Sequence, residues 1–147
     1  MKLALALAIG AALLAQAARA ETRWRWSLQG QGMSASGTFM TKDAANADGF
    51  YEITGISGDA NGVAISGLER AGTSIPGNDG YPVDNLVRTG SPALSEHGFA
   101  FSLANGAYAN PFYAAKFSPP GHYALLSDPA TGKTSEPLVA FTAAIVP

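Results

Sequence analysis

The sequence predicts one all-β domain of about eight short antiparallel strands, arranged as a meander-type sandwich or barrel. Its 147 residues include 17 glycines and nine prolines, which separate short segments where apolar and polar residues alternate. No window of about eleven or more residues shows the apolar stripe of an amphipathic helix. A chain of this length has room for a single domain, and we expect that domain to occupy residues 21–147.

The first half of the domain is expected to form four strands. Trp24, Trp26 and Leu28 alternate with polar residues, so they should lie on one side of the first strand. A turn over 57–62 ends in Asn61-Gly62, a pair that suits the positive φ angles of a hairpin loop. The strands are expected at 23–28, 36–41, 50–56 and 63–68.

The second half begins with a long connection. Residues 72–95 lose the alternation, and only 84–87 within them reads as extended. Loops of this length in a compact domain are usually functional or mobile. Further strands are expected at 98–103, 108–117, 123–127 and 138–146. Because Pro111 has no backbone N–H, it is expected to place the start of its strand at a sheet edge or a bend.

The first twenty residues, Met1–Ala20, have the three parts of a secretory signal peptide. Lys2 supplies the positive start, 3–15 form the apolar segment, and Ala18-Arg19-Ala20 provides small residues before a cleavage site. We therefore expect cleavage before Glu21 and a secreted or periplasmic protein. The apolar segment is shorter than the roughly 20 residues that a membrane-spanning helix needs, and no membrane span is expected in the mature chain.

Charge and cysteine content exclude several functional classes. Removing Met1–Ala20 takes away two basic residues, Lys2 and Arg19, and lowers the formal net charge from −2 to −4. Nucleic-acid binding requires a basic surface, so no nucleic-acid partner is expected. Because the chain has no cysteine, it has no disulfides, thiolate metal sites or cysteine-linked lipid anchors. The fold must be stable through burial alone.

Recognisable catalytic motifs are missing from the sequence. His97 and His122 are its two histidines, and their spacing lacks the His-Glu-x-x-His pattern of a zinc site. Ser57 lacks the second glycine of a nucleophile elbow. We therefore predict no catalytic residue, no metal ligand and no cofactor. The alternative is a small hydrolase that uses the carboxylates of Asp79 and Asp84 together with a histidine.

The candidate ligand-binding residues lie in the loop 77–85. They are Asn78, Asp79, Tyr81, Asp84 and Asn85. Tyr81 stands between a glycine and a proline and is expected to face water, whereas most other aromatic side chains should form the core. The loop oxygens also suit calcium, but the alternating Asp ligands of a calcium loop are missing, and Asx turns account for the same residues.

Several segments carry a family resemblance. They are Gly37–Phe39, Gly49–Gly58, Asn61–Ile65, Tyr81–Leu86 and Gly98–Phe101. They resemble small exported bacterial proteins of unknown biochemical role, many of which carry a C-terminal sorting tag of the PEP-CTERM type. The resemblance implies extracellular placement, association with the cell surface and its exopolysaccharide matrix, and no catalytic residues. The tag is missing after Val146-Pro147, which implies an untagged or trimmed member of that group.

The sequence thus favours an exported, non-catalytic β-domain with a structural or binding role in the periplasm or extracellular matrix. The expected partner is an extracellular polysaccharide or a cell-surface component. Two alternatives stay open: the small hydrolase, and a carrier that holds a small apolar ligand inside a hollow barrel.

Overall fold

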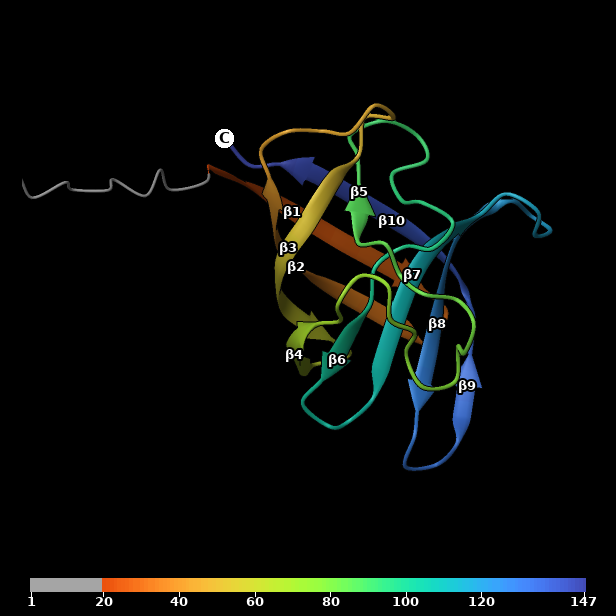
Figure 1. Cartoon of the computed structure of the whole chain (residues 1–147). Coiled ribbons are helices and arrows are strands. Elements are labelled where there is room, and N and C mark those ends of the chain that lie inside the picture. Colours follow the sequence, from red (N-terminus) through yellow and green to blue (C-terminus); the bar gives the residue numbers. More distant parts are fainter. Residues whose placement is uncertain (1–19) are drawn as a thin grey trace, which may run out of the picture.

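The computed structural model describes residues 20–147, which form one antiparallel sheet closed into an eight-stranded barrel (Figure 1). The strands are β1 (Glu21–Gly30), β2 (Met33–Lys42), β3 (Tyr51–Ala60), β4 (Val63–Leu68), β5 (Leu86–Val87), β6 (Phe101–Leu103), β7 (Tyr108–Ala114), β8 (Gly121–Asp128), β9 (Lys133–Ser135) and β10 (Leu138–Ile145). This part of the chain has no helix, which confirms the predicted all-β class. The predicted signal peptide lies, apart from Ala20, outside the described residues.

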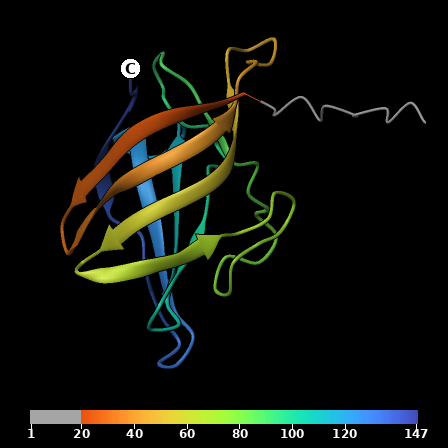
Figure 2. The same cartoon turned by 90° about the vertical axis from the view of Figure 1, so that its left-hand side faces the viewer.

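The strands follow one another around the barrel almost in sequence order, as expected for a meander. The order is β10-β1-β2-β3-β4-β6-β7-β8, and β8 pairs with β10 to close the barrel. This closing seam is short, because Leu138 pairs with Tyr123 and Val139 with His122. β9 extends the sheet from β8, and β5 pairs with β3. Figure 2 shows β1 to β4 curving across the front, with β7 and β8 behind them. In residues 20–147 no helix has the length and apolar character to cross a membrane.

Aromatic rings fill the middle of the barrel. Trp24, Trp26 and Phe39 are fully buried, so the predicted alternation in the first strand is confirmed. Trp26 stacks on Phe39 with 5.3 Å between ring centroids, and the edge of Phe99 meets Phe39 at 4.9 Å. Each ring of this size removes a large apolar area from water. Burial inside the barrel therefore stabilises the fold without disulfides.

The hairpin between β3 and β4 turns at the predicted pair, but its strand is longer than predicted. Asn61 and Gly62 have φ angles of 51° and 78°, as a two-residue hairpin turn requires. Residues 57–60, predicted as turn, instead continue β3. Gly58 allows this because it lies opposite Gly37 of β2, where a Cβ on either residue would overlap the backbone of the other strand.

Pro111 lies within β7 and has a ladder partner only on the β8 side, so the strand is locally an edge on its other side. It is buried in β7 and pairs with Ala124 of β8. Its carbonyl oxygen accepts a hydrogen bond of 3.1 Å from the N–H of Phe99. The N and O of one strand residue point to the same side. The missing N–H of Pro111 therefore faces the residues before β6, where the regular ladder has not yet begun.

The predicted long connection exists and packs on the outer face of the barrel. Ile75 and Val83 from this loop are buried against Leu125 of β8 and Ala100, in a small second core. Tyr108 and Phe112 of β7 pack against the same cluster. Outward-facing residues of the barrel wall thereby hold the loop in place, and the loop together with the wall forms the site described next.

Candidate functional site

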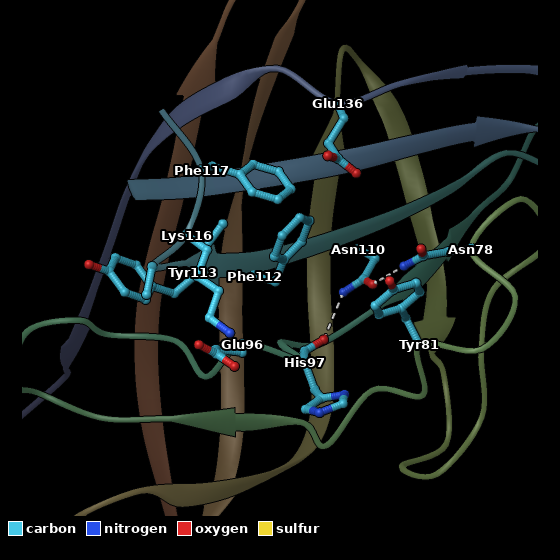
Figure 3. Close-up of a pocket in the computed structure, with 12 residues that line it drawn as sticks. Asn78, Tyr81, Glu96, His97, Asn110, Phe112, Tyr113, Lys116, Phe117 and Glu136 are labelled. Carbon is cyan, nitrogen blue, oxygen red and sulfur yellow. Dashed lines mark hydrogen bonds between the residues drawn. The ribbon is translucent and has the colours of Figure 1, made fainter. Parts of the chain in front are cut away.

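A groove of about 520 Å³ lies between the long loop and the outer wall of the barrel (Figure 3). The loop contributes Asn78, Tyr81, Glu96 and His97. Other lining residues come from β7, from residues 115–117 that follow it, and from Glu136 in the connection between β9 and β10. A volume of this size is in the range of roughly 300–1,000 Å³ that small-ligand sites occupy.

Aromatic rings line the groove and reach solvent. Tyr81 is 65% exposed and Phe117 is 41% exposed. Phe117 packs its ring edge-on against Phe112 at 6.1 Å and against Tyr123 at 4.8 Å. The expectation that Tyr81 faces water is confirmed. The groove therefore offers two exposed rings that a ligand can contact, and one of them, Phe117, is packed against other rings.

A buried amide joins the loop to the barrel beneath the groove. Asn110 of β7 donates to the carbonyl oxygens of Phe99 at 2.8 Å and His97 at 3.2 Å, and its Oδ1 accepts from Nδ2 of Asn78 at 2.9 Å. The bonds to His97 and Asn78 are the dashed lines in Figure 3. Because both ends of the amide are bonded, Asn110 fixes two loop positions relative to the strand. The groove is held in shape before any ligand binds.

His97 is oriented by the loop itself. Its Nδ1 lies 2.8 Å from the carbonyl oxygen of Pro82. A carbonyl oxygen only accepts hydrogen bonds, so Nδ1 must carry the proton. In the neutral imidazole, Nε2 is then the acceptor. His97 therefore presents a defined hydrogen-bonding ring at one side of the groove.

The charged side chains of the groove are Glu96, Lys116 and Glu136. Partial burial raises the pKa of the Glu136 carboxyl above its ordinary value. In Figure 3 Glu136 and Glu96 lie on opposite sides of Phe112. The ion pair found within residues 20–147 joins Lys42 to Glu52, and neither of these residues lines the groove. The three groove charges thus remain open to a polar ligand.

The structure separates the five residues predicted as ligand-binding. Asn78 and Tyr81 line the groove, whereas Asp79, Asp84 and Asn85 do not. Asp79 is exposed on the loop. Residues 78 and 81 therefore belong to the candidate site, and the others are placed elsewhere in the loop.

Asp84 and Asn85 serve the loop structure. Oδ1 of Asp84 accepts from Oγ of Ser95 at 2.6 Å and from the N–H of Leu86 at 3.3 Å. Asn85 is buried with φ of 57°, and its amide donates to the carbonyl oxygen of Glu69 at 2.8 Å. Both side chains thus bond within the fold.

Across the described range, 20–147, no three His, Cys, Asp or Glu side chains are placed to hold a metal ion. His122 is half-buried on β8 and does not line the groove, although its ring lies 5.3 Å from that of Tyr113, which does. Its Nε2 accepts from the N–H of Leu94 at 3.4 Å. His97 does line the groove, but the carboxylate beside it in the chain is Glu96, and neither Asp79 nor Asp84 lines the groove with it.

Nine groove residues escaped prediction from sequence: Glu96, Asn110, Phe112, Tyr113, Ala114, Ala115, Lys116, Phe117 and Glu136. Only Asn110 left a signal, since it is a polar residue within an otherwise apolar and aromatic strand. Glu136 reaches the groove because β9 and β10 lead the chain back to β8. No local sequence pattern predicts that the chain returns to β8 at this point.

Comparison of this chain with protein-family models, with curated proteins and with solved structures found no match. The resemblance to exported bacterial proteins therefore stays a prediction. The barrel and the groove are therefore the features of this protein that bear on its function.

Proposed function

We propose that this protein is a secreted or periplasmic, non-catalytic β-barrel domain that binds a polysaccharide in the aromatic groove. The observation that carries the proposal is the exposure of Tyr81 and Phe117 at a groove that also contains carboxylates and amides. Export rests on the signal-like segment Met1–Ala20. The partner would be an extracellular or cell-surface polysaccharide.

The lining chemistry supports a sugar ligand more than a purely apolar one. A sugar ring has an apolar C–H face that packs on an aromatic ring, and hydroxyl groups around its edge that need hydrogen-bond partners. Tyr81 and Phe117 provide the rings. Glu96 and Glu136 accept hydrogen bonds from hydroxyls, while Lys116 donates. An exposed apolar ring at the edge of such a groove is what recognition of this kind requires.

The groove is open at the surface and is preformed. Asn110 fixes the loop through buried hydrogen bonds, so little ordering would be needed on binding. An open groove can accept an internal stretch of a long chain. A polymer is therefore a more suitable ligand than a free monosaccharide.

The test is binding of the purified protein to a glycan array, followed by calorimetric titration with the glycans that bind. Tyr81→Ala and Phe117→Ala should each weaken binding about tenfold, or about 1.4 kcal/mol. Ile145→Ala is the matched control, because Ile145 is 43% exposed on β10 and does not line the groove. The proposal is wrong if no glycan binds, or if both groove variants bind as tightly as the control.

Glycoside hydrolysis is the second candidate, favoured by one observation. Glycosidases use two carboxyl groups, one of which stays protonated as the acid. Glu136 has a raised pKa and shares the groove with Glu96. If this candidate holds, a bound glycan should be cleaved, and Glu136→Gln should abolish cleavage while binding persists. Binding without any cleavage would eliminate it.

A further inference from the structure

A second hollow lies at one end of the barrel and shares no lining residue with the groove. It has a volume of about 380 Å³. The turns between β3 and β4, β6 and β7, and β8 and β9 surround it, at the lower end of the molecule in Figure 1. We call it the mouth cup. Mouths of β-barrels are common places for small-ligand sites.

The floor of the mouth cup is apolar and continuous with the aromatic core. Met33 and Ala60 line it and are buried members of that core. Leu103 and Leu126 also line it and pack on the same core while remaining partly exposed. The rings that fill the middle of the barrel therefore stop short of this end. A short apolar chain can extend the packing into the cup and remove its own methylene groups from water.

The rim of the cup is polar, and most of its side chains are already bonded. Asn61 accepts from the N–H of Ser34 and donates to the carbonyl oxygen of Gly32. Asn105 accepts from the N–H of Ala107. Asp128 accepts from the N–H of Ala130 through Oδ1. These groups serve their own turns.

Lys133 is the cation of the rim. It is exposed at the start of β9 and pairs across the ladder with Asp128. Within residues 20–147 the two side chains form no ion pair, since the ion pair found there joins Lys42 to Glu52. The other charge of the rim, the Asp128 carboxylate, is held by the N–H of Ala130 in its own turn. An apolar floor beneath the Lys133 ammonium group complements a ligand with an aliphatic chain and an anionic head.

We propose that the mouth cup binds a medium-chain aliphatic carboxylate, with the chain on the floor and the carboxylate at Lys133. The cup volume lies near the lower end of the range for ligand sites, which favours a chain of medium length over a long lipid. This site is independent of the polysaccharide groove, so either proposal can fail without the other.

The experiment titrates the purified protein with sodium decanoate below its micelle concentration, and follows binding by calorimetry and by amide NMR shifts. Decanoate should bind and shift the amides of Ala60, Val63 and Leu126. Lys133→Gln should weaken decanoate about fivefold or more, and Lys133→Glu more strongly. The uncharged probe decanol should bind the wild type and Lys133→Gln equally, because it has no carboxylate for the lysine to contact.

Lys116→Gln is the matched control, since Lys116 lies in the groove and not in the cup. It should leave decanoate binding unchanged. Ala60→Leu, which fills the floor, should weaken both decanoate and decanol, with circular dichroism reporting whether the fold is intact. The proposal is overturned if decanoate does not bind, if it shifts groove amides such as Tyr81 instead, or if Lys133→Glu binds it as well as wild type. Lys133 is exposed, so its variants keep the test valid even where Ala60→Leu fails to fold.

Discussion

The indole Nε1 of Trp24 donates a hydrogen bond of 3.0 Å to Oγ1 of Thr41, and both side chains are fully buried. The bond links β1 to β2 inside an otherwise apolar core. The neighbouring Trp26 shows the contrast, because its buried Nε1 has no hydrogen-bond partner. The barrel therefore contains one satisfied and one unsatisfied indole, two residues apart on the same strand.

Thr41→Val should destabilise the fold by about 1–3 kcal/mol, because it keeps the shape but leaves the Trp24 N–H buried without an acceptor. Urea denaturation followed by tryptophan fluorescence measures the change. Thr41→Ser retains the hydroxyl and should lose less. A Thr41→Val variant as stable as wild type, with the loss confined to Thr41→Ser, would show that the methyl group, and not the hydrogen bond, matters.

Acidification should reduce stability through His122. Burial lowers the pKa of this imidazole below its ordinary value of 6.5, and its Nε2 accepts from the N–H of Leu94, which needs the neutral ring. The unfolded chain therefore binds a proton more readily than the folded one, so the free energy of unfolding falls as pH drops through about 6.5 and below.

His122→Gln removes this titration, so its stability should depend less steeply on pH between about 7.5 and 5. The comparison with wild type isolates His122, because Glu136 titrates in both proteins. The raised pKa of Glu136 has the opposite effect on stability. The folded state binds a proton at Glu136 more readily than the unfolded chain, so this group stabilises the fold as pH drops. Parallel pH profiles for the two proteins would refute the assignment.

Gly98→Ala should destabilise the protein by about 2 kcal/mol or more. Gly98 has φ of 64°, and a Cβ there would overlap the carbonyl oxygen of Pro111. Gly106→Ala is the control, since its φ of 87° is also left-handed but nothing lies near its Cβ. It should carry only the backbone strain, about 1–2 kcal/mol. Denaturant midpoints that rank the two variants in the reverse order would contradict the steric explanation.

Asn110→Asp should loosen the loop over the groove. The carboxylate cannot donate to the carbonyl oxygens of Phe99 and His97, and it places a charge where the amide is buried. We expect a loss of about 2–4 kcal/mol at neutral pH. Faster hydrogen exchange should appear at the loop amides of Val83 and Asn85. Asn78→Ala removes one partly buried bond and should cost only about 1 kcal/mol.

Much of the barrel could be predicted because its cues are local. The alternation of Trp24, Trp26 and Leu28 and the pair Asn61-Gly62 each encode a geometry within a few residues. The bulge in β3 could not be predicted, because no local sequence cue marks it. The register shifts where Met40 pairs with Gly55 and Thr41 with Ile53. This shift lets both Ile53 and Ile56 reach the core, which breaks the period of two.

The groove was less predictable, since it joins segments distant in the chain. Asn78 and Tyr81 could be named from their loop, but Lys116 reaches the site because the loop packs beside the end of β7, and Glu136 through the return of the chain from β9. Asp84 and Asn85 show the converse. Their polar side chains looked available for a ligand, yet Asp84 accepts from the Ser95 hydroxyl and the N–H of Leu86, and the amide N–H of Asn85 donates to Glu69 while its Oδ1 is buried without a partner.

Closure of the sheet also bears on how molecules of this protein meet one another at high concentration. An unpaired strand edge is a template on which another chain can add and start cross-β stacking. In the described range, β8 pairs with β10 only at Leu138 and Val139, so closure joins the sheet at the start of β10 alone. Residues 140–145 of β10 and the three exposed residues of β9 keep an outer edge. If folded molecules of this protein associate through strand addition, these two edges are where we expect it to begin.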